Sequence, residues 1–149
     1  MTILAAPNLL DRVRARAADP ALLDLLDPAA DERTWLRLGA DDDLELWLIG
    51  WPPGARTDWH DHGPASGAFV VLDGELTEHT FPGGLQLVSH RDGGGRDFPA
   101  GHAHDVRNEG AVPALSLHGY SPRLTTMTRF RFHGDRLEAL GVESAGETW

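Results

Sequence analysis

Two histidines separated by a single residue, His60 and His62, are the first candidates for chemistry in this sequence. On a β-strand they would point to the same side, about 6–7 Å apart along the strand axis, while Asp61 would point away. Two imidazoles placed in this way can bind one transition-metal ion. The apolar run 68–72 that follows predicts a buried strand, and residues 73–74 (Asp-Gly) predict a hairpin turn.

A second stretch with histidines covers residues 93–108. Pro99 and Gly101 predict a tight turn before a strand that carries His104. Neutral imidazole suits iron, zinc, copper and nickel, and three protein ligands leave coordination positions open for a substrate. His102 is an alternative to His104 as the third ligand. Three histidines by themselves do not distinguish a zinc hydrolase from an iron oxygenase.

A third pattern of polar side chains lies in residues 113–122. Ser116, His118 and Tyr120 would share one face of a strand and alternate with Leu and Gly on the other face. A hydroxyl, an imidazole and a phenol suit the inside of a barrel only if they bond to one another. We therefore predict a hydrogen-bonded row beside the metal, with an outward polar face as the alternative.

The composition limits the class of protein. With 149 residues, 41% hydrophobic and 24% charged, we expect a single globular domain over residues 1–149. The absence of cysteine excludes disulfides and thiolate ligands, and it leaves eight histidines as the strong ligands. The formal net charge of -10 argues against nucleic acid and anionic membranes as partners. No transmembrane run or signal peptide is evident, so we expect a cytoplasmic protein.

The chain divides into a helical prefix and a β-rich part. Residues 8–26 predict one or two short helices, with Asn8 as an N-cap and Asp19-Pro20 at the start of the second. From about residue 33 to residue 133, many short strands separated by Gly and Pro turns predict an antiparallel sandwich or barrel. The strands that we expect are 34–38, 44–51, 68–72, 74–81, 86–89, 107–112, 114–120 and 127–132. After Gly134 we expect a loop and a final turn of helix.

The two stretches with histidines together resemble the paired motifs of the cupin superfamily, whose fold is a small jelly-roll-like antiparallel β-barrel. The positions that match are Gly54, His60, His62, Gly74, Gly93, Pro99, Gly101, His104 and Asn108. Gly67 stands where many cupins have a ligating glutamate. The resemblance therefore implies a site of three histidines without a carboxylate.

The row Ser116-Leu-His118-Gly-Tyr120-Ser-Pro makes the resemblance more specific. Together with the two histidine motifs it is similar to cysteine dioxygenase and its bacterial thiol dioxygenase relatives, over residues 33–130. The resemblance implies that one Fe(2+) ion is bound by His60, His62 and His104. It also implies that Ser116, His118 and Tyr120 form an outer-sphere triad. In this family both atoms of O2 are added to the sulfur of a thiol, which gives a sulfinic acid.

Two positions depart from the family pattern. The animal enzyme has a cysteine crosslinked to its tyrosine, and Gly67 at that position here rules the crosslink out. The family also binds the substrate carboxylate through an arginine from an early strand. The candidates are Arg37, which fits the local pattern better, and Arg33, which fits the distance to His60 better. Either guanidinium suits bidentate binding of a carboxylate.

We therefore expect a small cupin that uses Fe(2+) and O2 to oxidise a small carboxylated thiol, as a monomer or a homodimer. L-cysteine is the first candidate substrate, and 3-mercaptopropionate is the alternative. A zinc or manganese isomerase and a non-catalytic sensing cupin are the rival functions. Among the remaining candidates we expect three solvated histidines, His79, His90 and His133. We expect three tryptophans in the core, Trp47, Trp51 and Trp59. Arg123 and Met127 could border the pocket.

Overall fold

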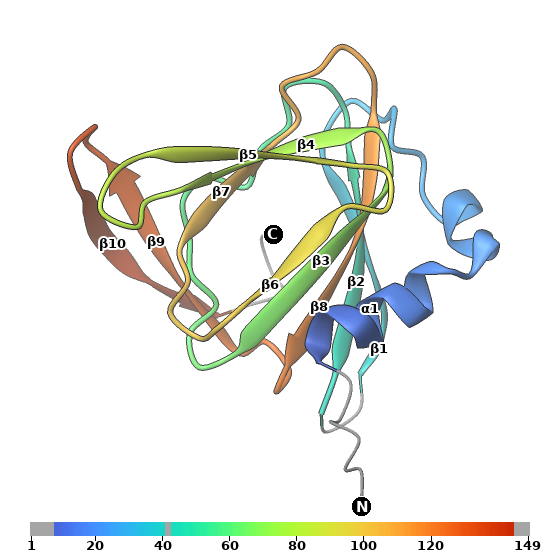
Figure 1. Cartoon of the computed structure of the whole chain (residues 1–149), viewed down its shortest axis with the longest axis horizontal. Helices are drawn as coiled ribbons and strands as arrows, with labels where there is room; N and C mark the ends of the chain where they lie inside the picture. The colour runs from blue at the N-terminus through green and yellow to red at the C-terminus, as the bar shows by residue number, and fades with distance from the viewer. Residues whose placement is uncertain (1–7, 41–42, 145–149) are drawn as a thin grey trace, which may run out of the picture.

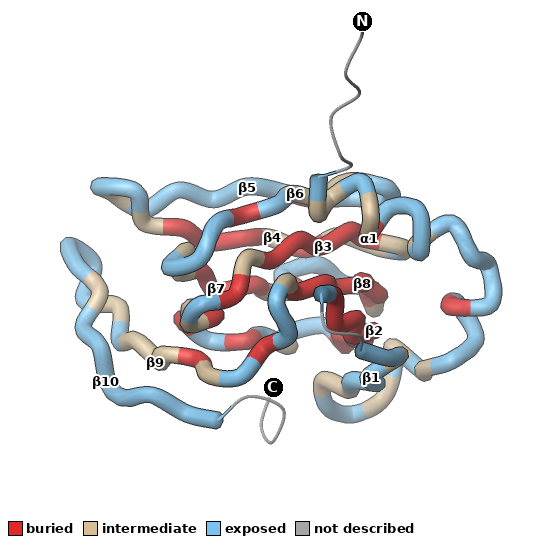
Figure 2. The backbone as a smooth tube through the Cα atoms, turned by 90° about the horizontal axis from the view of Figure 1, so that it is seen from below, coloured by how far each residue is buried: buried red, intermediate tan, exposed pale blue. Residues whose placement is uncertain are grey.

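The computed structural model describes residues 8–40 and 43–144. Its strands form two curved walls around a core, and the N-terminal helical segment lies outside, against one of the walls (Figure 1). Figure 2 shows that the buried residues gather on the strands of the two walls, where the walls face each other. This arrangement confirms the all-β fold with a short helical prefix.

The prefix contains two short helices, as residues 8–26 predict. The first, α1 (Leu9–Ala17), begins after Asn8, whose side-chain oxygen accepts a backbone hydrogen bond at 2.8 Å. A 3-10 helix, η1 (Pro20–Asp24), begins after Asp19, which accepts a similar bond at 2.9 Å. Both caps satisfy amides that have no partner within the helix. Among the described residues, no helix is long and apolar enough to cross a membrane.

The larger wall is a five-stranded antiparallel sheet with the order β1-β2-β8-β3-β6. Its strands are β1 (Thr34–Ala40), β2 (Glu45–Trp51), β8 (Ala114–Ser121), β3 (Ser66–Asp73) and β6 (Gly95–Phe98). The strand β8 lies at the centre of this wall, and every residue from 114 to 120 is buried.

The two faces of β8 belong to two separate cores. Leu115 and Leu117 pack with Val13 of α1 in an outer cluster, whereas Tyr120 belongs to the cluster between the walls. Because side chains alternate along a strand, Ser116 and His118 lie on the same inward face as Tyr120. The row is therefore inside the barrel, and the alternative of an outward polar face is wrong.

The opposite wall consists of two smaller antiparallel sheets and a segment between them. One sheet contains β5 (Gln86–Arg91), β4 (Glu75–Thr80) and β7 (His104–Arg107), and the other contains β9 (Thr126–Phe132) and β10 (Leu137–Ser144). Residues 56–60 lie between β7 and β9 and form isolated bridges with both. The outer strands β5 and β10 are mostly exposed (Figure 2).

The segment with His60 and His62 is not the continuous strand that the spacing predicts. Residues 54–65 form only isolated bridges, and β3 begins at Ser66. Pro64 lacks the amide that a continuous ladder would need. The two histidines nevertheless turn to one side, while the Asp61 carboxylate turns away and accepts two backbone hydrogen bonds, at 2.9 and 3.1 Å.

The hairpin predicted at residues 73–74 is wrong. These residues lead from β3 in one wall to β4 in the other, and the two strands do not pair. Gly74 has a φ angle of 81°, and a Cβ atom there would lie 2.6 Å from the carbonyl oxygen of Pro113. A glycine is therefore required, because it allows the chain to turn a corner between the walls at close range.

Three other local predictions also differ from the structure. Most of 107–112 is a loop, because β7 ends at Arg107. The strand β6 has only four residues, two of them charged, so it gives no apolar period. The tail predicted as a loop and a helical turn is the strand β10, whose exposed apolar side chains obscure the alternation. The strand expected at 34–38 continues to Ala40, and residues 41 and 42, which follow it, lie outside the described residues.

Asn108 ties the loop after β7 to neighbouring segments. Its side-chain amide donates to the carbonyl oxygens of Trp51 and Val112, both at 2.9 Å, and its Oδ1 atom accepts from the Gly110 amide at 3.0 Å. Its backbone also exchanges hydrogen bonds with residues 54 and 55. The side chain is buried, so these bonds replace hydration that folding removes.

We predict that Asn108→Ala lowers the free energy of unfolding by about 2–4 kcal/mol, because it leaves buried backbone groups without a partner. Urea denaturation would measure the loss. Thr125→Ala, at an exposed position, is the control and should change the stability by less than about 0.5 kcal/mol. Equal stabilities for the two variants would show that Asn108 does not hold the loops.

Candidate metal centre

His60, His62 and His104 meet between the walls. Their ring centroids lie 4.8–4.9 Å apart, and one ligand atom of each lies within 4.8 Å of those of the other two. The backbone brings them together, because the amide of His60 donates to the carbonyl of His104 and the reverse bond also forms, both at 3.0 Å. All three side chains are buried. The structure therefore gathers the three histidines that the two motifs predict as ligands.

The backbone at Asp58 orients the imidazole of His60. Asp58 has a φ angle of 64°, which is uncommon for a residue with a side chain. Its carbonyl oxygen lies 2.8 Å from Nδ1 of His60 and accepts the Nδ1 proton. The Nε2 atom of His60 is then the one that faces the cluster as an acceptor. Strain of this kind concentrates at functional sites.

The imidazole of His104 is oriented by a carboxylate, Glu78. The Nδ1 atom of His104 lies 2.7 Å from Oε2 of Glu78, which is completely buried. Neither histidine motif contains Glu78, and it is not among the residues predicted for the site. The signal that could have found it is the alternation of β4, in which a charged residue occupies an inward position between Leu76 and Thr80, both of them buried.

The three imidazoles fit a transition metal. Among the described residues, Nε2 of His60 and both ring nitrogens of His62 are buried and have no hydrogen-bond partner. Burial lowers the pKa of all three histidines, and their mutual repulsion lowers it further for His60 and His62. Neutral imidazoles offer lone pairs, and a bound metal would satisfy atoms that are otherwise buried without partners. The cluster could therefore hold a metal ion.

Gly67 is the position where a ligating glutamate or a crosslinked cysteine would stand. It pairs across the strands with Tyr120 on one side and Phe98 on the other. A Cβ atom at Gly67 would lie 2.4 Å from two ring carbons of Phe98 and 3.1 Å from Cδ1 of Tyr120. The Phe98 ring thus fills the space that a ligating or crosslinking side chain would need.

The inward row of β8 is hydrogen-bonded at its first two members. Oγ of Ser116 lies 2.7 Å from Nε2 of His118, and it also accepts a hydrogen bond from Nε1 of Trp51 at 2.8 Å. Burial lowers the pKa of His118 to about 3, so this imidazole is neutral at physiological pH. Because Ser116 already accepts from Trp51, its hydroxyl proton is available to His118.

Tyr120 connects this row to the metal cluster. Its ring stacks on that of His62 with a centroid distance of 5.2 Å and an interplanar angle of 27°. Burial raises the pKa of the Tyr120 phenol well above its usual value, although the charge of Arg33 opposes the shift. The phenol therefore keeps its proton and remains a hydrogen-bond donor beside the cluster.

The structure separates the two candidate arginines. Arg33 lies over the rings of Trp35 and Trp51, at 5.6 and 5.5 Å, and its charge acts on Tyr120. Within the described part of the chain, its buried NH1 atom has no hydrogen-bond partner. Burial, followed by the nearby charge of Arg129, lowers the pKa of Arg33 to about 10, so the guanidinium is still charged at neutral pH.

Arg37 lies in different surroundings. Its side chain is 44% exposed, and its Nε atom forms an ion pair with Glu45 at 3.1 Å. Glu45 is itself buried and also accepts the amide of Leu124. The Arg37 charge therefore already neutralises a buried carboxylate on the neighbouring strand. The Arg33 guanidinium instead lies over the Trp51 ring, and its charge acts on Tyr120.

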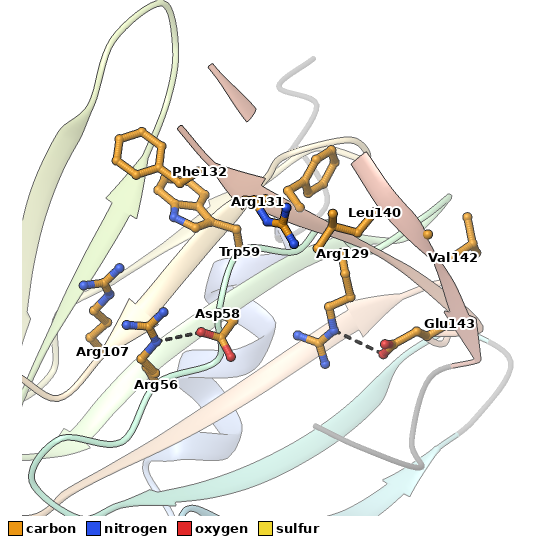
Figure 3. A pocket seen from close by; sticks show the side chains of 12 residues that line it. Arg56, Asp58, Trp59, Arg107, Arg129, Arg131, Phe132, Leu140, Val142 and Glu143 are labelled. Carbon is orange, nitrogen blue, oxygen red and sulfur yellow. Dashed lines mark hydrogen bonds and ion pairs between the residues drawn. The ribbon is translucent and has the colours of Figure 1, made fainter. Parts of the chain in front are cut away.

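A cavity of about 620 Å³ opens between segment 56–59 and the hairpin of β9 and β10 (Figure 3). Its lining contains four arginines, which are Arg56, Arg107, Arg129 and Arg131. Two carboxylates, Asp58 and Glu143, pair with Arg56 and Arg129 respectively. Arginine thus outnumbers the acidic residues in this lining, although the formal net charge of the whole chain is -10.

Arg129 lines this cavity, and its charge also affects the pKa of a residue in the three-histidine cluster. Besides burial, its positive charge contributes to the lowered pKa of both His60 and Arg33. Arg123 and Met127 are the residues that the sequence predicts at the border of the pocket, and Arg129 is not among them. Arg123 is exposed and Met127 is buried in the core. Besides its pair with Glu143, the guanidinium of Arg129 donates to the carbonyl oxygen of Thr57 at 2.9 Å, so it is held beside the segment that carries His60.

The other histidines have different surroundings from those expected. Nε2 of His102 lies 3.1 Å from Oε2 of Glu78, and His102 is not among the three clustered histidines. His79 and His90 were expected to be solvated, but both are buried, and each contacts a glutamate. Both carboxylates come from positions that are distant in the sequence, which explains the error. His133 is exposed, as expected.

The two walls with the three-histidine cluster between them have the architecture of a cupin. The chain also matches the family model of cysteine dioxygenase type I over residues 7–133. It therefore belongs to the cysteine dioxygenase type I family.

Solved structures support the fold. A protein of Thermus thermophilus is 26% identical, with a TM-score of 0.61, and the match covers 68% of this chain and 94% of that one. A protein with a double-stranded β-helix domain from Klebsiella pneumoniae is 19% identical, covering 68% and 86%, with a TM-score of 0.58. A sugar phosphate isomerase of the cupin superfamily from Silicibacter pomeroyi is 24% identical, covering 80% and 81%, with a TM-score of 0.60.

We predict that Gly67→Ala destabilises the protein by about 1–3 kcal/mol, because the added methyl group overlaps the buried ring of Phe98. Thermal or urea unfolding would measure the loss. The same substitution in a Phe98→Leu background should be less destabilising, with a coupling energy of at least about 0.5 kcal/mol. Additive losses in the double variant would contradict this contact.

Proposed function

We propose that the protein is an iron-dependent thiol dioxygenase that adds both atoms of O2 to the sulfur of a small carboxylated thiol and forms a sulfinic acid. The observation that carries the proposal is the buried cluster of neutral His60, His62 and His104 next to a protonated Tyr120. Membership of the cysteine dioxygenase type I family supports the same chemistry.

In this proposal the three imidazoles hold Fe(2+). Bound there, iron would supply open coordination positions for the thiolate and for O2, together with the redox chemistry that joins them. The ring of Phe98 fills the space at Gly67, so this position cannot supply a carboxylate ligand. Three neutral ligands do not reduce the charge of the metal, which favours an anionic thiolate.

Tyr120 would act as a hydrogen-bond donor to the reacting groups. Its pKa is raised by burial, so it can hold a proton at a fixed place without giving it up to water. Ser116 and His118 would fix each other's side chains through their 2.7 Å hydrogen bond. Trp51 donates to the same Ser116 hydroxyl, and Arg33 lies over the Trp51 ring. All three side chains of the row are buried, so their polar groups are held beside the three-histidine cluster away from water.

Arg33 would bind the substrate carboxylate. Its buried NH1 atom has no partner among the residues that the structure describes, and a guanidinium suits two parallel bonds to a carboxylate. Its position over the indole of Trp51 limits its mobility. Arg37 is not proposed for this role, because it neutralises Glu45.

L-cysteine is the substrate that we propose first, and 3-mercaptopropionate is the alternative. L-cysteine carries an ammonium group in addition to the carboxylate. The charges of Asp58 and Asp105 reach Arg33, although each carboxylate also pairs with an arginine, Arg56 or Arg107 respectively. We propose that they favour this ammonium when the carboxylate is bound at Arg33. Turnover of the two thiols side by side would decide between them, and a strong preference for 3-mercaptopropionate would overturn the choice of L-cysteine.

We predict that protein purified without added metal contains iron and consumes O2 only when a thiol is present, with a sulfinic acid as product. Elemental analysis, an oxygen electrode and mass spectrometry of the product would test this. Tyr120→Phe should retain iron and lose about 10–100-fold in turnover, because one aligned donor is removed. Zinc or manganese without thiol-dependent uptake would favour another cupin chemistry, and no turnover of any thiol would favour a sensing role.

We predict that Arg33→Gln raises the KM for a carboxylated thiol about 10–100-fold, because the bonds between guanidinium and carboxylate are lost. Arg37→Gln is the matched control and should leave KM within about twofold. Cysteamine, which has no carboxylate, should react with all three proteins at similar rates. A larger effect of Arg37→Gln would assign the carboxylate to that residue instead.

A further inference from the structure

We infer that Glu78 is a positioning residue of the metal centre. It holds His104 through Nδ1 and supplies the negative charge that the centre lacks at Gly67. This inference rests on the proposed metal centre and goes further, because neither histidine motif contains Glu78. The conclusion follows from four contacts of one buried carboxylate.

Glu78 lies on β4, next to β7, which carries His104. Its Oε2 atom accepts from Nδ1 of His104 at 2.7 Å and from Nε2 of His102 at 3.1 Å. Its Oε1 atom accepts from Nε2 of His90 at 3.1 Å and from the guanidinium of Arg96 at 3.2 Å. The side chain is 0% exposed, so all of these bonds form away from water.

The contact with His104 decides which nitrogen of this ring can bind a metal. Because Nδ1 donates its proton to Glu78, Nε2 carries the lone pair. The corresponding partner of His60 is the neutral carbonyl of Asp58. A carboxylate makes an imidazole a more basic ligand than a carbonyl does, so His104 would be the strongest donor of the three.

The surroundings of Glu78 hold its carboxylate in place. Three histidines and the guanidinium of Arg96 direct N–H groups at its two oxygen atoms. These donors come from different parts of the fold, namely β5, β6, β7 and the turn before β7. Because the carboxylate is held from several directions, its orientation towards His104 is fixed.

A second metal ion is the main alternative use of these side chains. Ligand atoms of Glu78, His102 and His104 lie within 4.8 Å of one another. However, Nε2 of His102 and Nδ1 of His104 already donate hydrogen bonds to Glu78, so a metal ion at this place would have to displace both N–H protons. Moreover, the same ring of His104 would have to bind two metals. The contacts therefore favour orientation of one ligand over a second site.

The test measures metal binding by Glu78→Gln, which has nearly the same shape without the charge. Anaerobic titration with Fe(II), and with Co(II) for its visible absorption bands, gives affinity, stoichiometry and coordination. We expect affinity to fall about 10–100-fold and the Co(II) spectrum to change. Glu109→Gln is the matched control, because Glu109 also accepts a hydrogen bond from a histidine, at 2.8 Å, but that histidine, His79, lies outside the three-histidine cluster. The metal affinity of this variant should equal that of the wild type.

Two further variants keep the test decisive if Glu78→Gln does not fold. Arg96→Gln removes a partner of Glu78 whose side chain is 37% exposed, and it should weaken metal binding while it retains the fold. His102→Gln can still donate to Glu78 and should bind metal within about threefold of the wild type. A loss of one of two bound metals in either Glu78→Gln or His102→Gln would establish the second site and overturn the inference.

Wild-type affinity in Glu78→Gln or in Arg96→Gln would also overturn the inference. If the wild type binds one metal but oxidises no thiol, the proposed function fails, and the metal titration still decides the role of Glu78. Absence of any metal binding by the wild type would remove the centre and therefore both proposals.

Discussion

The backbone pair between His60 and His104 is the constraint on which the rest of the site depends. Two reciprocal hydrogen bonds join a segment between β2 and β3 to the start of β7, and they bring together residues that lie far apart in the sequence. Directly opposite residues on antiparallel segments place their side chains close together. The left-handed backbone at Asp58 and the bonds of Asn108 both support this segment. Without the pair, no cluster would form.

Burial gives these side chains their chemical properties. Removal of water lowers the pKa of the clustered histidines and raises that of Tyr120, so the centre offers neutral lone pairs next to a donor that stays protonated. Positive charge from Arg33 and Arg129 acts on the same region. Negative charge is kept one side chain away from the ligands, at Glu78. This division of charge suits an anionic substrate, which is what the proposed thiol dioxygenase requires.

Much of the fold follows from local signals, and the exceptions have physical causes. Asn8 and Asp19 cap helices as expected, and most of the predicted strands form. The corner at Gly74 was mistaken for a hairpin because both require a positive φ angle. The strand β10 was missed because its side chains are exposed and only its pairing with β9 defines it. Pairing across the sequence leaves no local trace that could correct either error.

The sequence by itself determined the cupin motifs, the polar row on β8 and the family to which they are similar, because each rests on spacing within a few residues. Only the tertiary structure decided which side chains share surroundings. It placed Arg33 over Trp51 and Arg37 on Glu45, and it brought Glu78 to His104. Such choices depend on the register of strands that are distant in the chain, and a shift of one residue would reverse the face of every side chain concerned.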